Sequence, residues 1–140
     1  TNALLSRFPN LKWIAVDYWP AGFPLRYGGV MTVERQVEVR SLFMSVMAKH
    51  GDRITLMEKD TVLAANDVED ESLDLVFIDA DHSYEGCKAD IIAWRPKLRP
   101  GGWLMGHDYE PVSFPGVVQA VDELVPSARI DVDFVWLVQT

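Results

Sequence analysis

The stretch that decides the fold is Leu73–Glu110, which reads LDLVFIDADHSYEGCKADIIAWRPKLRPGGWLMGHDYE. Its first residues, Leu73–Ile78, are mostly apolar and predict a β-strand that is covered on both faces, and Trp103–Met105 predict a second strand after a Gly-Gly turn. Between these strands, Glu85–Leu98 is predicted to form a crossover helix. A strand, a helix and a strand of this combined length imply that the two strands pair in parallel.

Acidic and imidazole side chains follow both of these strands. Asp79, Asp81 and His82 come directly after the first strand, and His107 and Asp108 come after the second. Because the carboxyl ends of parallel strands meet at one edge of a sheet, we expect all five side chains at the same edge. Open α/β sheets bind their ligands at that edge, so the sequence places a functional site there.

Apolar strands and helical stretches alternate along the rest of the chain. Strands are predicted at Lys12–Val16, Ile54–Met57 and Phe134–Val138, and helices at Asn2–Phe8, Thr32–His50, Thr61–Ala65 and Val117–Leu124. The connection Tyr18–Val30 is rich in Pro and Gly and is long enough to suggest a binding role. The alternation predicts one α/β domain over residues 1–140, with a Rossmann-like, doubly wound and mostly parallel sheet.

Aromatic residues within the predicted strands are expected in the core, namely Trp13, Phe77 and Trp103. Along the predicted helix that Thr32 caps, four apolar residues share one face, namely Val33, Val37, Met44 and Met47.

Composition limits the classes of partner. The 140 residues include 13 basic and 21 acidic side chains, and the net charge of −8 argues against non-specific binding to nucleic acids or anionic membranes. The single cysteine, Cys87, excludes an intrachain disulfide and fits a reducing compartment. No apolar run approaches the ~20 residues that span a bilayer, so we expect a cytoplasmic protein. The sequence leaves the oligomeric state open, with a homodimer as one option.

Four sequence features together resemble the class I S-adenosylmethionine-dependent methyltransferases. They are VDYW at Asp17, a short strand followed by Asp60, the segment FIDADHSYEG, and LRPGGWLMGHDY followed by PGVVQAVDEL. The D-x-D-H-x-Y and H-D strand ends are most similar to a branch of small O-methyltransferases. The resemblance extends over nearly the whole chain. It implies S-adenosylmethionine as cofactor and methyl transfer to an oxygen of a small molecule, such as a sugar or phenolic hydroxyl.

The resemblance also implies which residues contact the cofactor. Asp17 matches the acid that accepts hydrogen bonds from the ribose hydroxyls, although a carboxylate at a strand end can simply accept hydrogen bonds within a turn. Asp60 matches the acid that accepts from the adenine amino group, and its alternative role is to cap the helix that follows. The remaining cofactor contacts are expected at Tyr18, Thr61, Asp79, Ala80 and Tyr84.

Two mechanisms remain open for the reaction itself. Methyl transfer to a hydroxyl requires loss of its proton, which needs either a general base or a metal ion that lowers its pKa. Asp79 and Asp108 match positions that supply carboxylates to Mg²⁺ or a similar divalent ion in metal-dependent O-methyltransferases. His82 and His107 are the candidate bases, with Asp79 as their acidic neighbour, for a mechanism without metal.

Family members begin the nucleotide-binding fold with a strand and a Gly-rich turn of the type E-x-G-x-x-x-G. The present sequence begins at Thr1, within the helix that follows that turn, and we therefore expect an N-terminally incomplete domain that lacks the first, central strand. Two other functional classes stay open. One is a non-catalytic nucleotide-binding module or inactive relic, and the other is a different Rossmann-like enzyme such as an NAD-dependent dehydrogenase.

Overall fold

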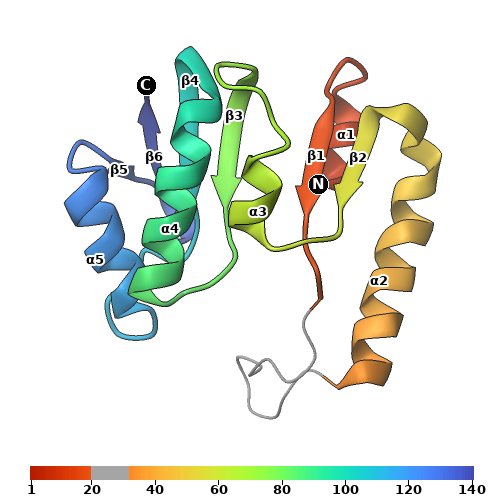
Figure 1. The fold of residues 1–140 in the computed structure, drawn as a ribbon, viewed down its shortest axis with the longest axis horizontal. Helices are drawn as coiled ribbons and strands as arrows, with labels where there is room; N and C mark the ends of the chain where they lie inside the picture. The colour runs from red at the N-terminus through yellow and green to blue at the C-terminus, as the bar shows by residue number, and fades with distance from the viewer. Residues whose placement is uncertain (20–31) are drawn as a thin grey trace. The chain divides into compact units, whose positions relative to one another are not determined.

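The computed structural model describes residues 1–19 and 32–140 and divides into two compact units. Unit 1 consists of Thr1–Asp60 and unit 2 of Thr61–Thr140 (Figure 1). Most of the predicted binding loop Tyr18–Val30 lies outside the described residues. No helix in the described part of the chain combines the length and the apolarity that crossing a membrane requires.

A pair of parallel strands forms the sheet of unit 1. The elements of this unit are α1 (Asn2–Arg7), β1 (Trp13–Val16), α2 (Val33–Met47), the 3₁₀ segment η1 (Ala48–Arg53) and β2 (Ile54–Met57). The strands pair from Trp13 opposite Ile54 to Val16 opposite Met57. These elements confirm the predicted order, and the side chain of Thr32 caps α2 by accepting a hydrogen bond from the backbone N–H of Arg35.

Arg53 ties the end of η1 to the first helix. Its guanidinium donates to the carbonyl oxygens of Leu5 at 3.0 Å and Phe8 at 3.2 Å, and it lies 3.0 Å from Nδ1 of His50. Because the guanidinium can only donate, Nδ1 of His50 accepts and its Nε2 donates to Asn2 at 3.0 Å. Burial and the neighbouring Arg53 lower the pKa of His50, which keeps this ring neutral.

The apolar face of α2 is exposed over most of the helix. Met47 is buried, but Val33 is 59% exposed, Val37 57% and Met44 43%. Helical spacing identifies residues that share a face, but it does not identify what covers that face. Polar and aromatic side chains on other positions of α2 make its contacts, with Arg40 donating two 2.6 Å hydrogen bonds to Glu58 and the Phe43 ring lying 5.7 Å from that of Trp19.

Unit 2 contains one four-stranded sheet. Its elements are α3 (Thr61–Ala65), β3 (Leu73–Ile78), α4 (Tyr84–Trp94), η2 (Arg95–Lys97), β4 (Leu98–Gly106), α5 (Pro115–Leu124), β5 (Arg129–Ile130), η3 (Val132–Phe134) and β6 (Trp136–Gln139). The strand order is β3-β4-β6-β5. As predicted, β3 and β4 pair in parallel, with Phe77 opposite Met105, whereas β6 runs antiparallel to β4.

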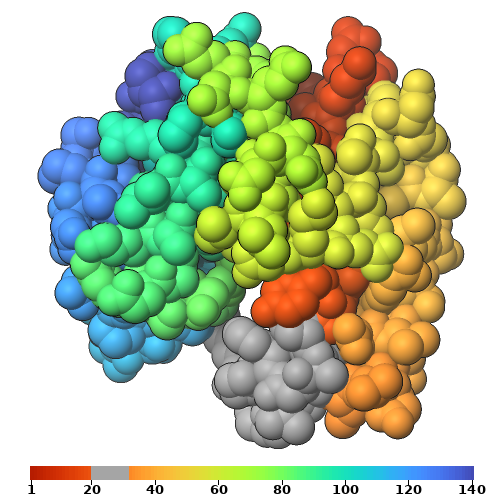
Figure 2. All heavy atoms as spheres, viewed as in Figure 1, coloured from red at the N-terminus to blue at the C-terminus, as the bar shows by residue number. Residues whose placement is uncertain are grey.

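The helices α4 and α5 cover one face of this sheet and pack against each other (Figures 1 and 2). Val76, Ile78 and Leu104 are buried, as residues that alternate towards the helices should be. Their neighbours face the opposite side, and there Phe77 is 42% exposed and Trp103 37%. The expectation that β3 is covered on both faces, with Phe77 and Trp103 in the core, is therefore wrong.

A glycine and a tryptophan close the carboxyl end of the central strand pair. Gly106, the last residue of β4, lies opposite Trp136, whose side chain is fully buried. A Cβ atom on Gly106 would lie 2.5 Å from the indole carbon Cε2, a distance at which atoms overlap. The missing side chain therefore allows the Trp136 indole to pack directly against the backbone at the end of β4, one residue before His107.

Candidate active site

Asp81 and Ser83 build the turn that leads from β3 into α4. Oδ1 of Asp81 accepts from the N–H of Ser83 at 2.9 Å, and Oγ of Ser83 accepts from the N–H of Gly86 at 3.1 Å. Both bonds satisfy backbone donors of the kind that a helix start leaves unpaired. A Cβ on Gly86 would lie 2.5 Å from the Asp81 carboxylate, so the turn requires glycine at this position.

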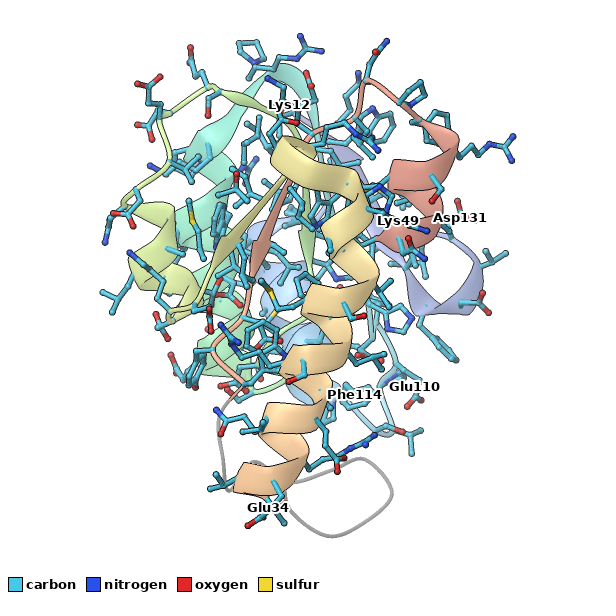
Figure 3. All side chains as sticks on the ribbon, turned by 90° about the vertical axis from the view of Figure 1, so that its right-hand side faces the viewer. Lys12, Glu34, Lys49, Glu110, Phe114 and Asp131 are labelled. Carbon is cyan, nitrogen blue, oxygen red and sulfur yellow. The ribbon has the colours of Figure 1, made fainter. Side chains whose placement is uncertain are left out.

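Asp108 joins the two strand ends through His82. Its Oδ2 lies 2.7 Å from Nε2 of His82, and the same nitrogen lies 3.7 Å from Oδ1 of Asp79. The His82 ring also stacks on Phe114, with ring centroids 4.6 Å apart. Figure 3 labels Phe114 and Glu110, which mark the segment between β4 and α5. The structure therefore brings Asp79, His82 and Asp108 together, as their positions in the sequence predicted.

The second oxygen of Asp108 holds His107. Nδ1 of His107 lies 3.1 Å from Oδ1 of Asp108, and the backbone N–H of His107 donates to Ile78 at 3.1 Å, which continues the β3–β4 ladder by one residue. Among the described residues, Nε2 of His107 has no hydrogen-bond partner. Asp108 is only 7% exposed and has a positive φ of 60°, a conformation that Asp tolerates better than most residues.

Electrostatics at this site favour a charged His82. The carboxylates of Asp79 and Asp108 raise the pKa of His82 above its ordinary value, and partial burial opposes them. Asp79, His82, His107, Cys87 and Trp136 are among the residues that line a recess of about 10 Å³, which is roughly large enough for one water molecule. Burial raises the pKa of Cys87 to about 11, so its thiol stays protonated near neutral pH and is a poor nucleophile or metal ligand.

One oxygen each from Asp79 and Asp108 and one nitrogen of His82 lie within 4.8 Å of one another, close enough to hold a metal ion after small adjustments. The donor set fits a divalent transition metal better than Mg²⁺, which prefers oxygen ligands alone. A metal at this position would replace the hydrogen bond between His82 and Asp108.

The predicted cofactor residues differ in exposure and in hydrogen bonding. In unit 1, Asp17 is exposed and its Oδ1 accepts from the N–H of Trp19 at 2.7 Å, Tyr18 is 53% exposed, and Asp60 is exposed directly before α3. In unit 2, Ala80 is exposed, whereas Oγ1 of Thr61 accepts from Nε1 of Trp94 at 2.8 Å.

Tyr84, the last predicted cofactor residue, donates its hydroxyl proton to Glu123 of α5. The sequence alone gave no indication that Phe114, Gly116 and α5 contact the His82 segment. The Phe-Pro-Gly segment at 114–116 is a recognisable helix start, but nothing in it indicates what it contacts.

A family model described as a methyltransferase domain matches residues 3–109. The chain belongs to this methyltransferase-domain family. A curated relative, "Uncharacterized protein y4gI" of Sinorhizobium fredii, is 42% identical over 103 residues, which make up 69% of this chain but 10% of the relative. The chain therefore spans about a tenth of the length of that relative.

Solved structures of methyltransferases share the fold. The calicheamicin methyltransferase CalS11 is 20% identical, with a TM-score of 0.67 over 99% of this chain and 65% of its own. The O-methyltransferase NovP is 15% identical, with a TM-score of 0.66 over 99% of this chain and 64% of its own. At these identities the likeness shows the Rossmann-like α/β fold that the sequence predicted, and it leaves the acceptor unassigned.

The raised pKa of His82 predicts how its contribution to stability depends on pH. Because the folded-state pKa lies above the unfolded value of 6.5, the stabilisation is complete below 6.5 and is lost as the pH rises through the folded pKa. The difference in free energy of unfolding between the wild type and His82→Gln should therefore be larger at about pH 5.5 than at about pH 8.5. Urea denaturation at both pH values measures this difference.

His50→Gln is the matched control because the pKa of His50 is lowered. Its effect on the free energy of unfolding should change with pH in the opposite direction. An effect of His82→Gln that is equal at both pH values, or larger at the higher one, would contradict the assigned charge of His82.

Proposed function

We propose that the protein transfers the methyl group of S-adenosylmethionine to an oxygen of a small acceptor, such as a sugar or phenolic hydroxyl, with His107 as the general base. The observation that carries this proposal is the contact between Asp108 and Nδ1 of His107, which leaves Nε2 without a partner among the described residues. A carboxylate that holds one imidazole nitrogen orients the ring and stabilises its protonated form, while the other nitrogen can accept a proton.

The reaction needs one proton transfer and one displacement. Nε2 of His107 accepts the hydroxyl proton while the acceptor oxygen attacks the methyl carbon. The bond between that carbon and sulfur breaks, and its electron pair stays on sulfur, so S-adenosylhomocysteine leaves as a neutral thioether. The imidazolium that forms on His107 lies beside the buried carboxylate of Asp108, which stabilises its charge.

His82 has a different task in this mechanism. Its Nε2 is engaged by Asp108 at 2.7 Å and faces Asp79, so this nitrogen is less available to an acceptor than Nε2 of His107. The bond from His82 holds Asp108 in place, and the two carboxylates that raise the pKa of His82 favour the protonated ring, which reduces their mutual repulsion. We therefore assign His82 and Asp79 to positioning and charge balance at the site.

Family membership supports S-adenosylmethionine as the cofactor, and the exposed Asp17 carboxylate supports a contact with its ribose. The Asp17 backbone N–H donates to Met57, and its carboxylate accepts only from the N–H of Trp19 among the described residues, so its second oxygen is available to a ligand. We assign further cofactor contacts to the exposed residues Tyr18, Asp60 and Ala80.

Asp17→Ala should weaken binding of S-adenosylhomocysteine to the full-length protein by about 1.5–3 kcal/mol, the scale of losing hydrogen bonds to a charged group. Isothermal titration calorimetry measures this change. Asp52→Ala, which removes an exposed carboxylate elsewhere in unit 1, is the control and should bind as the wild type does. Unchanged affinity in Asp17→Ala would remove Asp17 from the cofactor site, and absence of binding to the wild type would overturn the proposed function.

A metal-dependent mechanism is the second candidate, favoured by the grouping of Asp79, His82 and Asp108. A bound divalent ion would polarise the acceptor hydroxyl and so replace the base. These residues would supply two carboxylate oxygens and one imidazole nitrogen as its ligands.

The two mechanisms predict opposite results. With His107 as base, His107→Ala should lower kcat by ~10²–10⁴-fold, and treatment with a chelator should leave the wild-type rate unchanged. Glu85→Ala, an exposed change at the start of α4, is the control for handling and stability. If chelation abolishes turnover, added Mn²⁺ restores it and His107→Ala stays active, the metal mechanism is correct and the assignment of His107 is wrong.

A further inference from the structure

Two tyrosines lie close in sequence to His82 and Asp108, and the hydroxyls of both donate hydrogen bonds to side chains of α5. Tyr84 follows His82 by two residues, and its hydroxyl donates to Oε2 of Glu123 at 2.5 Å. Tyr109 follows Asp108 directly, and its hydroxyl donates to Oδ1 of Asp122 at 2.7 Å. The adjacent carboxylates of Asp122 and Glu123 are thus hydrogen-bonded to the segments that follow β4 and β3, which carry Asp108 and His82.

Lys88 strengthens the bond to Tyr84. Its Nζ lies 2.7 Å from Oε1 of Glu123 and 2.7 Å from the Tyr84 hydroxyl, and it is 5.0 Å from the centre of the Tyr84 ring. Hydrogen bonds from Lys88 and Tyr84 lower the pKa of Glu123, which keeps it ionised as an acceptor. Asp122 raises the pKa of Tyr109, which keeps that hydroxyl protonated as a donor.

The first turn of α5 touches the same loop from the other end of the helix. A Cβ on Gly116 would lie 2.5 Å from the backbone nitrogen of Tyr84 and 2.9 Å from the carbonyl oxygen of His82. Phe114, the residue that precedes α5, stacks on the His82 ring. The helix therefore contacts the His82 segment at its start and accepts hydrogen bonds from both tyrosines near its end.

We propose that Asp122 and Glu123 are positioning residues, which hold the bond between His82 and Asp108 closed by way of Tyr109 and Tyr84. The proposal rests on the proposed function, in which Asp108 must orient His107 while His82 balances its charge. His82 and Asp108 lie on different loops, so their 2.7 Å contact depends on the spacing between the segments after β3 and β4. Catalytic groups must be held to within ~0.5 Å of the productive geometry, and a fixed helix provides this better than two loops alone.

This arrangement assigns Tyr84 a task other than the cofactor contact that the sequence predicted. Its hydroxyl is occupied by Glu123 and Lys88, both from helices of unit 2. Removal of the hydroxyl should therefore affect turnover through His82 and Asp108, and it should leave cofactor affinity unchanged.

The test is the double variant Tyr84→Phe, Tyr109→Phe of the full-length protein, which removes the two hydroxyls and keeps both rings. Glu85→Gln, an exposed change in the same helix turn as Tyr84, is the control. We expect kcat to fall by about 10- to 100-fold with an unchanged dissociation constant for S-adenosylhomocysteine. Asp122→Asn combined with Glu123→Gln should reproduce this fall, because amides are weaker acceptors than carboxylates.

A second readout follows the bond between His82 and Asp108 without any turnover. In protein with ¹⁵N-labelled histidine, the ring N–H proton in this bond should exchange slowly and give a downfield signal in the wild type and in Glu85→Gln. In the double tyrosine variant this signal should disappear through faster exchange. A wild type without such a signal, or a variant that keeps the signal and the wild-type kcat, overturns the proposal.

The two readouts separate this proposal from the proposed function. Loss of the ring N–H signal in the double variant, in a protein whose wild type transfers no methyl group, would support the positioning role and refute the methyltransferase mechanism. A lower kcat with an unchanged ring N–H signal would instead refute the positioning role, because the tyrosines would then act directly on a ligand.

Discussion

The buried carboxylate of Asp108 is the constraint on which the rest of the site depends. It is 7% exposed and contacts two imidazoles, His82 at 2.7 Å and His107 at 3.1 Å. A buried carboxylate is costly unless charged or hydrogen-bonded partners compensate for the lost water, and the two rings provide that compensation. The same contacts fix which nitrogen of each ring faces the carboxylate, and they direct Nδ1 of His107 to Asp108, so that its Nε2 has no hydrogen-bond partner among the described residues.

Several features of the fold around Asp108 allow it to contact both imidazoles. Gly106 gives Trp136 room beneath the end of β4, and Gly116 lets α5 approach the backbone of the His82 loop. The left-handed conformation of Asp108 turns the chain sharply after the strand. A non-glycine residue in this conformation lowers the stability of the folded state, and such residues cluster at functional sites.

The parallel pairing of β3 and β4 could be predicted from the sequence because a short crossover helix forces it, and the meeting of His82 with Asp108 followed from it. The contacts of α5 could not be predicted, since Tyr84 and Glu123 are 39 positions apart and no periodic pattern links them. The exposure of Phe77 and Trp103 was also missed, because an apolar strand pattern does not show what covers each face of the sheet. The sequence likewise could not show which nitrogen of each histidine faces Asp108, which the geometry shows.

The most direct test of this account is the rate of methyl transfer by Asp108→Asn in the presence of a chelator. An asparagine has the same shape, but it cannot balance an imidazolium, and its amide would favour the wrong ring tautomer. We expect kcat to fall by at least ~10²-fold while the affinity for S-adenosylhomocysteine stays within about twofold of the wild type. Asp74→Asn, which changes a surface ion pair with Arg99, should retain the wild-type rate. A chelator-treated Asp108→Asn enzyme that works at the wild-type rate would contradict the central role of this carboxylate.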